Sequence, residues 1–278
     1  MSTSSGLVAG LRDLIKREKA SEFANTLKIS PYGRELDDWQ VKVLDSEKRY
    51  MALNCSRQVG KSTVTAIKAL HRGIYTPDSL ILLVSPSLRQ SQEIFKKVSY
   101  YARQVADLPD KIEDNQLSLM FNNGSRIVAL PGSQKTIRGY SAANLVIVDE
   151  AAYAEESLFS ALSPMLSISN GDLMLLSTPN GKLGFFWDVW DKGGEDWDKY
   201  EIPWWMCPRH NEQRLMALKQ VIGQYRFGVE FECQFYDPED AVFSSDDLEA
   251  AMALTIDGVN IEIGENTLMS SELEVLQL

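Results

Sequence analysis

A nine-residue stretch, Cys55–Thr63, constrains the fold of this chain more than any other feature. It reads Cys-Ser-Arg-Gln-Val-Gly-Lys-Ser-Thr and follows the apolar run Tyr50–Asn54. A strand, a loop that ends in Gly-Lys-Ser, and a helix-forming stretch from Thr63 to Leu70 are typical of a nucleotide-phosphate site. Backbone N–H groups at such a helix N-terminus favour an anion. The common pattern G-x-x-x-x-G-K-[ST] is missed only at its first glycine, which is Cys55 here.

The loop side chains predict binding of a nucleoside triphosphate with a metal ion. Lys61 can reach the β- and γ-phosphates, and the Ser62 hydroxyl can bind Mg²⁺. The alternative is an ordinary strand-to-helix turn, because Gly-Lys-Ser is short enough to occur by chance.

A second motif favours the nucleotide site over that alternative. The apolar run Leu145–Val148 ends in Asp149 and Glu150, the pattern of a buried parallel strand that delivers acids to its carboxyl end. In phosphoryl transfer the first acid holds Mg²⁺ and the second can act as general base on the attacking water. The alternative is a strand followed by a solvated acidic helix start. Together the two motifs predict an ATPase.

Composition narrows the class of protein. A chain of 278 residues, 44% of them hydrophobic, can form one large α/β domain or two small ones. No apolar run approaches the ~20 residues of a membrane helix, and Met1–Gly6 lacks the features of a secretory signal. Three cysteines give no disulfide framework and suit a reducing cytosol. Cys207–His210 has C-x-x-H spacing, but His71 is the one other histidine, so we expect no zinc site.

The net charge of −11 comes from one end of the chain. Eleven acids and no Lys or Arg follow from Asp237 onward, and the preceding residues balance 28 acids with 28 bases. A neutral domain with an acidic C-terminal segment does not exclude nucleic acid as a partner.

Alternating apolar strands and helical stretches predict an α/β fold with a mostly parallel central sheet and helices on both faces. The expected helices are Leu7–Leu27 (ended by Pro31–Gly33), Asp37–Leu44, one capped by Ser87 and running to Arg103, and one starting at Phe185. The expected strands are Leu80–Val84, a hairpin of Leu117–Phe121 with Arg126–Leu130, Leu145–Val148, Leu173–Leu176 and Tyr200–Trp204. The turn Ser177–Gly181 follows Leu173–Leu176, the expected strand that comes after the acidic one. Its polar groups can sense the γ-phosphate there. The alternative is a plain turn.

These motifs together resemble the ATPase domain of the large terminase subunit, the DNA-packaging motor of tailed bacteriophages. That family tolerates the missing first glycine, has a loop S-R-Q-x-G-K-[ST] matched by Ser56–Ser62, and a motif V-x-x-D-E-A matched by Val146–Ala151. Ser177–Gly181 resembles its coupling motif. The resemblance spans roughly residues 36–243. It implies a RecA-like (ASCE-type) P-loop NTPase that hydrolyses ATP with Mg²⁺.

The resemblance also implies a role for each matched residue. Gln40 contacts adenine, Arg57 moves between phosphates and neighbouring carboxylates, and Arg138 is an arginine finger donated across a subunit interface. The alternatives are a surface arginine for Arg57 and a DNA-binding or solvated loop arginine for Arg138. The expected nucleotide-binding residues are Gln40, Ser56, Gln58, Val59, Gly60, Lys61, Ser62 and Thr63. The expected catalytic residues are Glu150, Lys61, Arg57 and Arg138, the metal ligands Ser62 and Asp149, and the coupling residues Ser177, Thr178 and Asn180.

The implied partners are double-stranded DNA, a homo-oligomeric ring on the portal protein, and the small terminase subunit, in the host cytoplasm and without a membrane. We expect an N-terminal helical segment (1–35), the ATPase domain (36–243) and an acidic segment (244–278). Full-length members continue into a nuclease, for which about 35 residues are too few, so we expect ATP hydrolysis without DNA cleavage.

Two other functions stay open on the sequence alone. A superfamily 2 helicase shares these motifs but needs a second RecA-like domain, and strand displacement would favour it. A nucleotide-gated DNA-binding scaffold would not need Glu150, and phosphate release would exclude it. DNA contact could involve Arg89, Lys96, Lys97 and Arg103 on one helix, or these could form a solvated face.

Overall fold

The computed structural model describes residues 10–11, 13–29 and 35–237. These residues belong to one compact unit, Met1–Tyr236, with Asp237 at its boundary. The predicted turn at Pro31–Gly33 and the acidic segment 244–278 lie outside the described residues. Within the described ranges, no helix is both long enough and apolar enough to cross a membrane.

A single eight-stranded sheet organises the unit, with the order β3-β4-β5-β2-β6-β7-β1-β8. Neighbours from β5 to β8 in that order pair in parallel. The parallel strands are β1 (Tyr50–Cys55), β2 (Leu80–Ser85), β5 (Arg126–Pro131), β6 (Leu145–Asp149), β7 (Asp172–Ser177) and β8 (Trp197–Ile202). The central ones are almost wholly buried, as their unbroken apolar runs require of strands covered on both faces. The predicted mostly parallel sheet is confirmed.

An antiparallel extension forms one edge of the sheet. Strands β3 (Lys111–Asp114) and β4 (Ser118–Phe121) add to β5, and β4 with β5 is the predicted hairpin. Gly124 closes its turn with φ +84°, and a Cβ there would lie 2.0 Å from Asp78 Oδ1. Both the backbone conformation and the space therefore require glycine. The charged edge strand β3 was not expected from its sequence.

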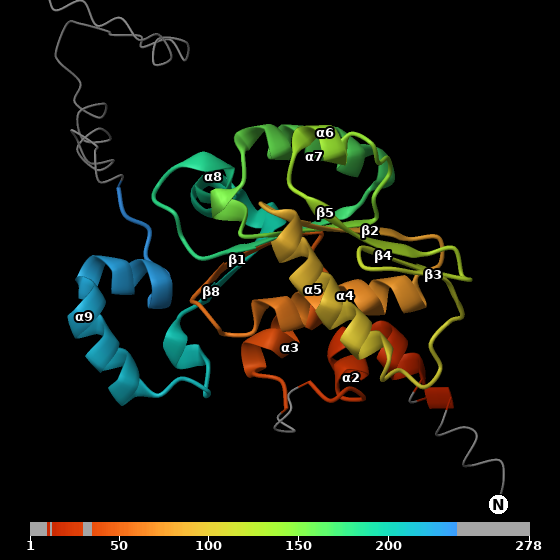
Figure 1. The fold of residues 1–278 in the computed structure, drawn as a ribbon, viewed down its shortest axis with the longest axis horizontal. Coiled ribbons are helices and arrows are strands. Elements are labelled where there is room, and N and C mark those ends of the chain that lie inside the picture. Colours follow the sequence, from red (N-terminus) through yellow and green to blue (C-terminus); the bar gives the residue numbers. More distant parts are fainter. Residues whose placement is uncertain (1–9, 12, 30–34, 238–278) are drawn as a thin grey trace, which may run out of the picture. The chain divides into compact units, whose positions relative to one another are not determined.

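Helices cover both faces of the sheet, as predicted (Figure 1). One face packs against α2 (Ala20–Ala24), α3 (Asp38–Asp45), α4 (Lys61–Tyr75) and α5 (Leu88–Ala102). The other packs against α6 (Gln134–Ile137), α7 (Glu156–Ser169) and α8 (Gly184–Lys192). The remaining elements are α9 (Glu212–Phe231) and three 3₁₀ turns, η1 (Ala151–Tyr153), η2 (Gly194–Asp196) and η3 (Trp204–Met206). Two apolar layers thus enclose the strands.

Most of the predicted helix boundaries are confirmed, and two elements differ. Ser87 caps α5, and its side chain accepts from the Gln90 N–H. The predicted N-terminal helix is interrupted at Lys19, which has extended backbone. Beyond the break Phe23 is buried against the rings of His71 and Tyr75, a tertiary contact that outweighs the continuous helical pattern.

The last strand also differs from its prediction. It starts at Trp197 and ends at Ile202, because its register against β1 begins at the pair Tyr50↔Trp197 and ends at Cys55↔Ile202. Pro203, which has no N–H to donate, follows directly.

The strand order sets the geometry of the site. Strand β7 lies between β1, which leads into the phosphate loop, and β6, which ends in the two acids. The carboxyl ends of these three parallel strands meet at one edge of the sheet. The loop, the acids and the turn after β7 are therefore neighbours, although they come from three distant parts of the chain.

Candidate nucleotide site

The phosphate loop has the backbone of an anion cradle. Gln58 and Gly60 take left-handed conformations, with φ of 60° and 108°, and Gly60 caps the N-terminus of α4. Such alternation directs successive N–H groups into one concavity. Cys55, at the position of the missing glycine, has no such conformation and still pairs in the β-sheet. Since it is fully buried, with its thiol pKa raised to about 12 by burial, this position is part of the core and does not need glycine.

Glu150 lies where all three strand ends meet. Its carboxylate Oε1 is 3.3 Å from Lys61 Nζ, and its Oε2 accepts from Ser177 Oγ at 3.3 Å. Glu150 itself has φ 54° and ψ 45°, a left-handed conformation that costs a non-glycine residue free energy and is common at functional sites. The structure therefore brings together three residues that the sequence assigned to one reaction.

Asp149 is partly buried, and its buried Oδ1 has no hydrogen-bond partner among the described residues. Burial raises the pKa of its carboxyl from 3.8 to about 6, against the attraction of Lys61. Ser62 lines the same cavity as Asp149 and Glu150, with a volume of about 430 Å³. An unpartnered buried carboxylate oxygen beside a hydroxyl fits Mg²⁺, which proteins usually hold with one or two carboxylates and the substrate phosphates. Among the described residues, no group of three or more His, Cys, Asp or Glu side chains could hold a metal ion by itself.

Helix α5 forms the opposite wall of this cavity. Its contribution includes Arg89 and Lys97, the latter half-buried and attracted electrostatically to Asp149. Lys96 also lines the cavity but is exposed and ion-paired with Glu93. Three of the four basic residues considered for DNA contact, all but Arg103, thus share a cavity with the acids. DNA contact by this helix stays a prediction.

The predicted coupling turn is joined to the segment after Glu150. Ser177 and Thr178 are fully buried. The exposed Asn180 donates to the Ala152 carbonyl at 3.2 Å, and the Tyr153 hydroxyl donates to the Pro179 carbonyl at 3.4 Å. Two hydrogen bonds therefore link the turn after β7 to η1.

The three residues assigned by resemblance alone have different surroundings. Gln40 is buried in α3, and its Nε2 would lie 2.7 Å from a Cβ at Gly60, so it borders the phosphate loop. Arg57 is ion-paired with Glu230 in α9, and half of its side chain is exposed. Arg138 is exposed at the C-terminus of α6 and lines a cavity with residues of α7. The structure does not bring Arg138 to the phosphate loop of its own chain.

Two residues behind the loop were missed by the sequence analysis. Arg209 donates to both carboxylate oxygens of Asp37, at 2.9 and 2.6 Å, and to the Val59 carbonyl at 2.7 Å. The His210 ring lies 3.2 Å from the Arg57 carbonyl. Their C-x-x-H motif, Cys207–His210, suggests at most a metal site. No local pattern signals these contacts, because their partners are 150 to 172 residues away in sequence.

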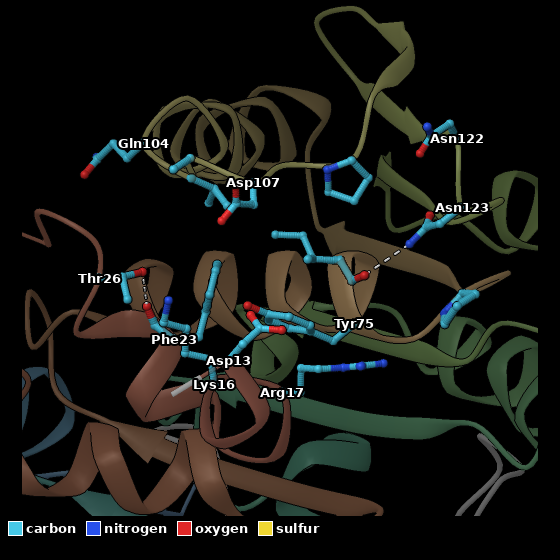
Figure 2. Close-up of a pocket in the computed structure, with 15 residues that line it drawn as sticks. Asp13, Lys16, Arg17, Phe23, Thr26, Tyr75, Gln104, Asp107, Asn122 and Asn123 are labelled. Carbon is cyan, nitrogen blue, oxygen red and sulfur yellow. Dashed lines mark hydrogen bonds between the residues drawn. The ribbon is translucent and has the colours of Figure 1, made fainter. Parts of the chain in front are cut away.

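A second cavity lies at the other end of α4 and has a different lining (Figure 2). Its volume is about 470 Å³, and it is bordered by Lys16, Arg17, Tyr75 and Asp107 among others. A helix of 15 residues is roughly 20 Å long, so this cavity is well separated from the phosphate loop. None of the motif residues lines it.

The fold and this geometry define a class of protein. A phosphate loop after β1, an acid pair after β6, and a polar turn on the strand between them form the core of a RecA-like P-loop NTPase. The family described as terminase large subunit, T4likevirus-type, N-terminal matches residues 52–250. The chain belongs to this terminase large subunit family.

Known relatives agree with that family. The terminase large subunit of Thermus virus P23-45 is 26% identical over 69% of this chain and 47% of its own length. The chain thus spans about half the length of the curated relatives it matches. The ATPase domain of the Thermus phage P74-26 large terminase has a similar fold, with a TM-score of 0.65 at 21% identity over 77% of this chain and 97% of that one. The large terminase of a thermophilic bacteriophage, solved in complex with ADP, has a TM-score of 0.59 at 10% identity over 72% of this chain and 54% of that one.

Proposed function

We propose that this chain hydrolyses ATP to ADP and phosphate and that the reaction drives double-stranded DNA into a viral procapsid. The observation that carries the ATPase part is the contact of Glu150 with Lys61 and Ser177, from three adjacent strand ends. Nucleotide binding alone would not need a second acid there. Family membership supports the DNA-packaging role over that of a superfamily 2 helicase or a DNA-binding scaffold without turnover.

Each residue of the site has a task in this reaction. The N–H groups of the loop and Lys61 Nζ neutralise the phosphates. Glu150 accepts a proton from the attacking water, and its bond from Ser177 holds the carboxylate in place. Asp149 and Ser62 would hold Mg²⁺, which supplies charge neutralisation at the β- and γ-phosphates when bound. Gln40, which lies next to Gly60, would contact the base.

We further propose that the site is completed by a neighbouring copy in a ring. Arg138 is exposed at the end of α6, which packs on the face of the sheet opposite α4, as expected for a residue that acts on the next subunit. Arg57 would leave Glu230 for the phosphates when nucleotide binds. A ring assembled on the portal protein, with the small terminase subunit as a further partner in the host cytoplasm, fits this role.

Turnover measured against protein concentration tests the proposal. We expect phosphate release per chain to rise with concentration and to rise again with linear double-stranded DNA, because neighbours complete the site. No phosphate release with Mg²⁺ and ATP at any concentration would contradict the ATPase function. Turnover that is independent of concentration would contradict the shared site.

The Arg138→Ala variant tests the finger directly. We expect the concentration-dependent turnover to fall by about 10³-fold or more, since a finger supplied by a neighbour contributes 10³–10⁵ in rate. Lys135→Ala is the matched control, because Lys135 is an exposed cation in the same short helix and should leave turnover unchanged. Equal turnover of Arg138→Ala and Lys135→Ala would exclude the finger.

A further inference from the structure

The outer side of the phosphate loop is bound by a short segment that follows β8. Two consecutive residues there, Arg209 and His210, each contact one loop carbonyl, those of Val59 and Arg57. In a planar trans peptide group the C=O and the N–H point in opposite directions, so a carbonyl turned outward leaves the N–H of the following residue turned inward. These contacts therefore favour the loop conformation in which the N–H groups face the phosphates.

Arg209 also connects the loop to the helix that carries Gln40. Its two terminal nitrogens bind both oxygens of Asp37, which precedes α3, while one of them also binds Val59. Asp37 in turn starts a capping box in which its N–H donates to Gln40 Oε1 at 2.9 Å. One guanidinium thus fixes the loop backbone and the helix start that orients Gln40.

The chemistry of this link is specific to arginine. Only a planar group with several N–H donors can bind a carboxylate with two bonds and a carbonyl with a third, whereas a lysine ammonium is a single point donor. The Arg209 side chain is one-third exposed, but that of Asp37 is only 8% exposed. The carboxylate therefore depends on this partner.

We propose that Arg209 is a positioning residue that sets the affinity of the phosphate loop for nucleotide. It acts through the Val59 carbonyl and Asp37 and does not touch the reacting atoms. The inference rests on the proposed nucleotide binding and goes beyond it, since it places a determinant of affinity about 150 residues from the loop in sequence. Losing Arg209 frees both the loop backbone and the start of α3.

Titration with a fluorescent ADP analogue tests this, on the full chain with Arg209→Ala, Arg209→Lys and Arg214→Ala. We expect Arg209→Ala to weaken binding by about 10- to 100-fold, the effect of losing charge-assisted hydrogen bonds, and Arg209→Lys to recover little of it. Arg214 is exposed at the start of α9 and serves as the matched control; its variant should bind like the wild type. At saturating ATP, turnover of Arg209→Ala should stay within about threefold of the wild type, because the loss is in binding.

Two further measurements separate positioning from general folding. Millimolar guanidinium should restore binding to Arg209→Ala, since the empty site accepts that ion. Asp37→Asn combined with Arg209→Ala should bind no worse than Arg209→Ala alone, because the two residues act as one unit. Binding by Arg209→Ala within about threefold of the wild type would overturn the inference, as would weak binding with a large drop in Tm and no rescue. A wild type that does not bind the analogue would instead overturn the proposed function.

Discussion

The two sides of the phosphate loop differ in how well their polar groups are paired. The inner side faces the cavity with Asp149 and Glu150, and the outer side contacts Arg209, His210 and Glu230. On the inner side, the Asp149 oxygen has no partner among the described residues, Glu150 is in a left-handed conformation, and Lys61 reaches Glu150 only at 3.3 Å. On the outer side, Arg209 makes three hydrogen bonds of 2.6–2.9 Å. The Arg57 N–H donates to the Glu230 carbonyl at 2.9 Å.

The difference shows that groups which disfavour folding lie on the cavity side of the loop. Buried charges and strained backbone cost stability wherever they are not compensated. Here they face the cavity in which phosphates and Mg²⁺ would compensate them. The hydrogen bonds on the outer side stabilise the loop conformation when no nucleotide is bound. Variants on the inner side should therefore change chemistry or raise stability, and variants on the outer side should change affinity.

The largest effect is expected for Glu150→Gln on the inner side. Turnover should fall by about 10²–10⁴-fold, because the amide cannot accept the proton of the attacking water, while binding of ATP is retained. Phosphate release and nucleotide titration measure the two quantities. Glu93→Gln is the control, since Glu93 lines the same cavity but is exposed and paired with Lys96. Retained turnover in Glu150→Gln would remove it as the base.

A smaller effect is expected for Asp149→Asn, which should raise the stability of the folded protein. The folded-state pKa of Asp149 is raised from 3.8 to about 6. Its stability contribution is therefore complete below pH 4 and is lost as the pH rises through 6. Without nucleotide and Mg²⁺, the variant should be more stable by about 2–3 kcal/mol at pH 8, and by less at pH 5. Thermal unfolding at both pH values measures this, and a destabilised variant at pH 8 would contradict the inner-side interpretation.

The smallest effect is expected for Glu230→Gln on the outer side. The Arg57 side chain is half exposed and that of Glu230 is 29% exposed, so losing the ion pair should change the free energy of unfolding by less than about 1 kcal/mol. Nucleotide affinity should rise a few-fold, because Arg57 is then free to approach the phosphates. Reduced affinity at unchanged Tm would mean that Glu230 supports the loop through Arg57.

The sequence predicted which residues lie together on the inner side of the loop, and it predicted none of the contacts on the outer side. Cys55–Thr63 and Asp149–Glu150 are short local patterns whose chemistry depends on residue type, and the unbroken apolar runs identified the strands that carry them. The break at Lys19 and the edge strand β3 are set by tertiary packing, which no local pattern encodes. The contacts of Arg209 join distant segments of the chain. An isolated arginine and an isolated aspartate form no pattern that the sequence could reveal. The roles of Gln40, Arg57 and Arg138 stay predictions from resemblance.

The long separation between the loop and its outer side has a consequence for synthesis. Arg57 precedes Glu230 by 173 residues, so a ribosome adding about 5–20 residues per second completes the outer side roughly 10 to 30 seconds after the loop emerges. During that interval the nascent chain contains the whole phosphate-loop sequence but lacks the contacts of Arg209, His210 and Glu230 with the loop backbone. Tight nucleotide binding should begin only when nearly the whole domain has left the ribosome.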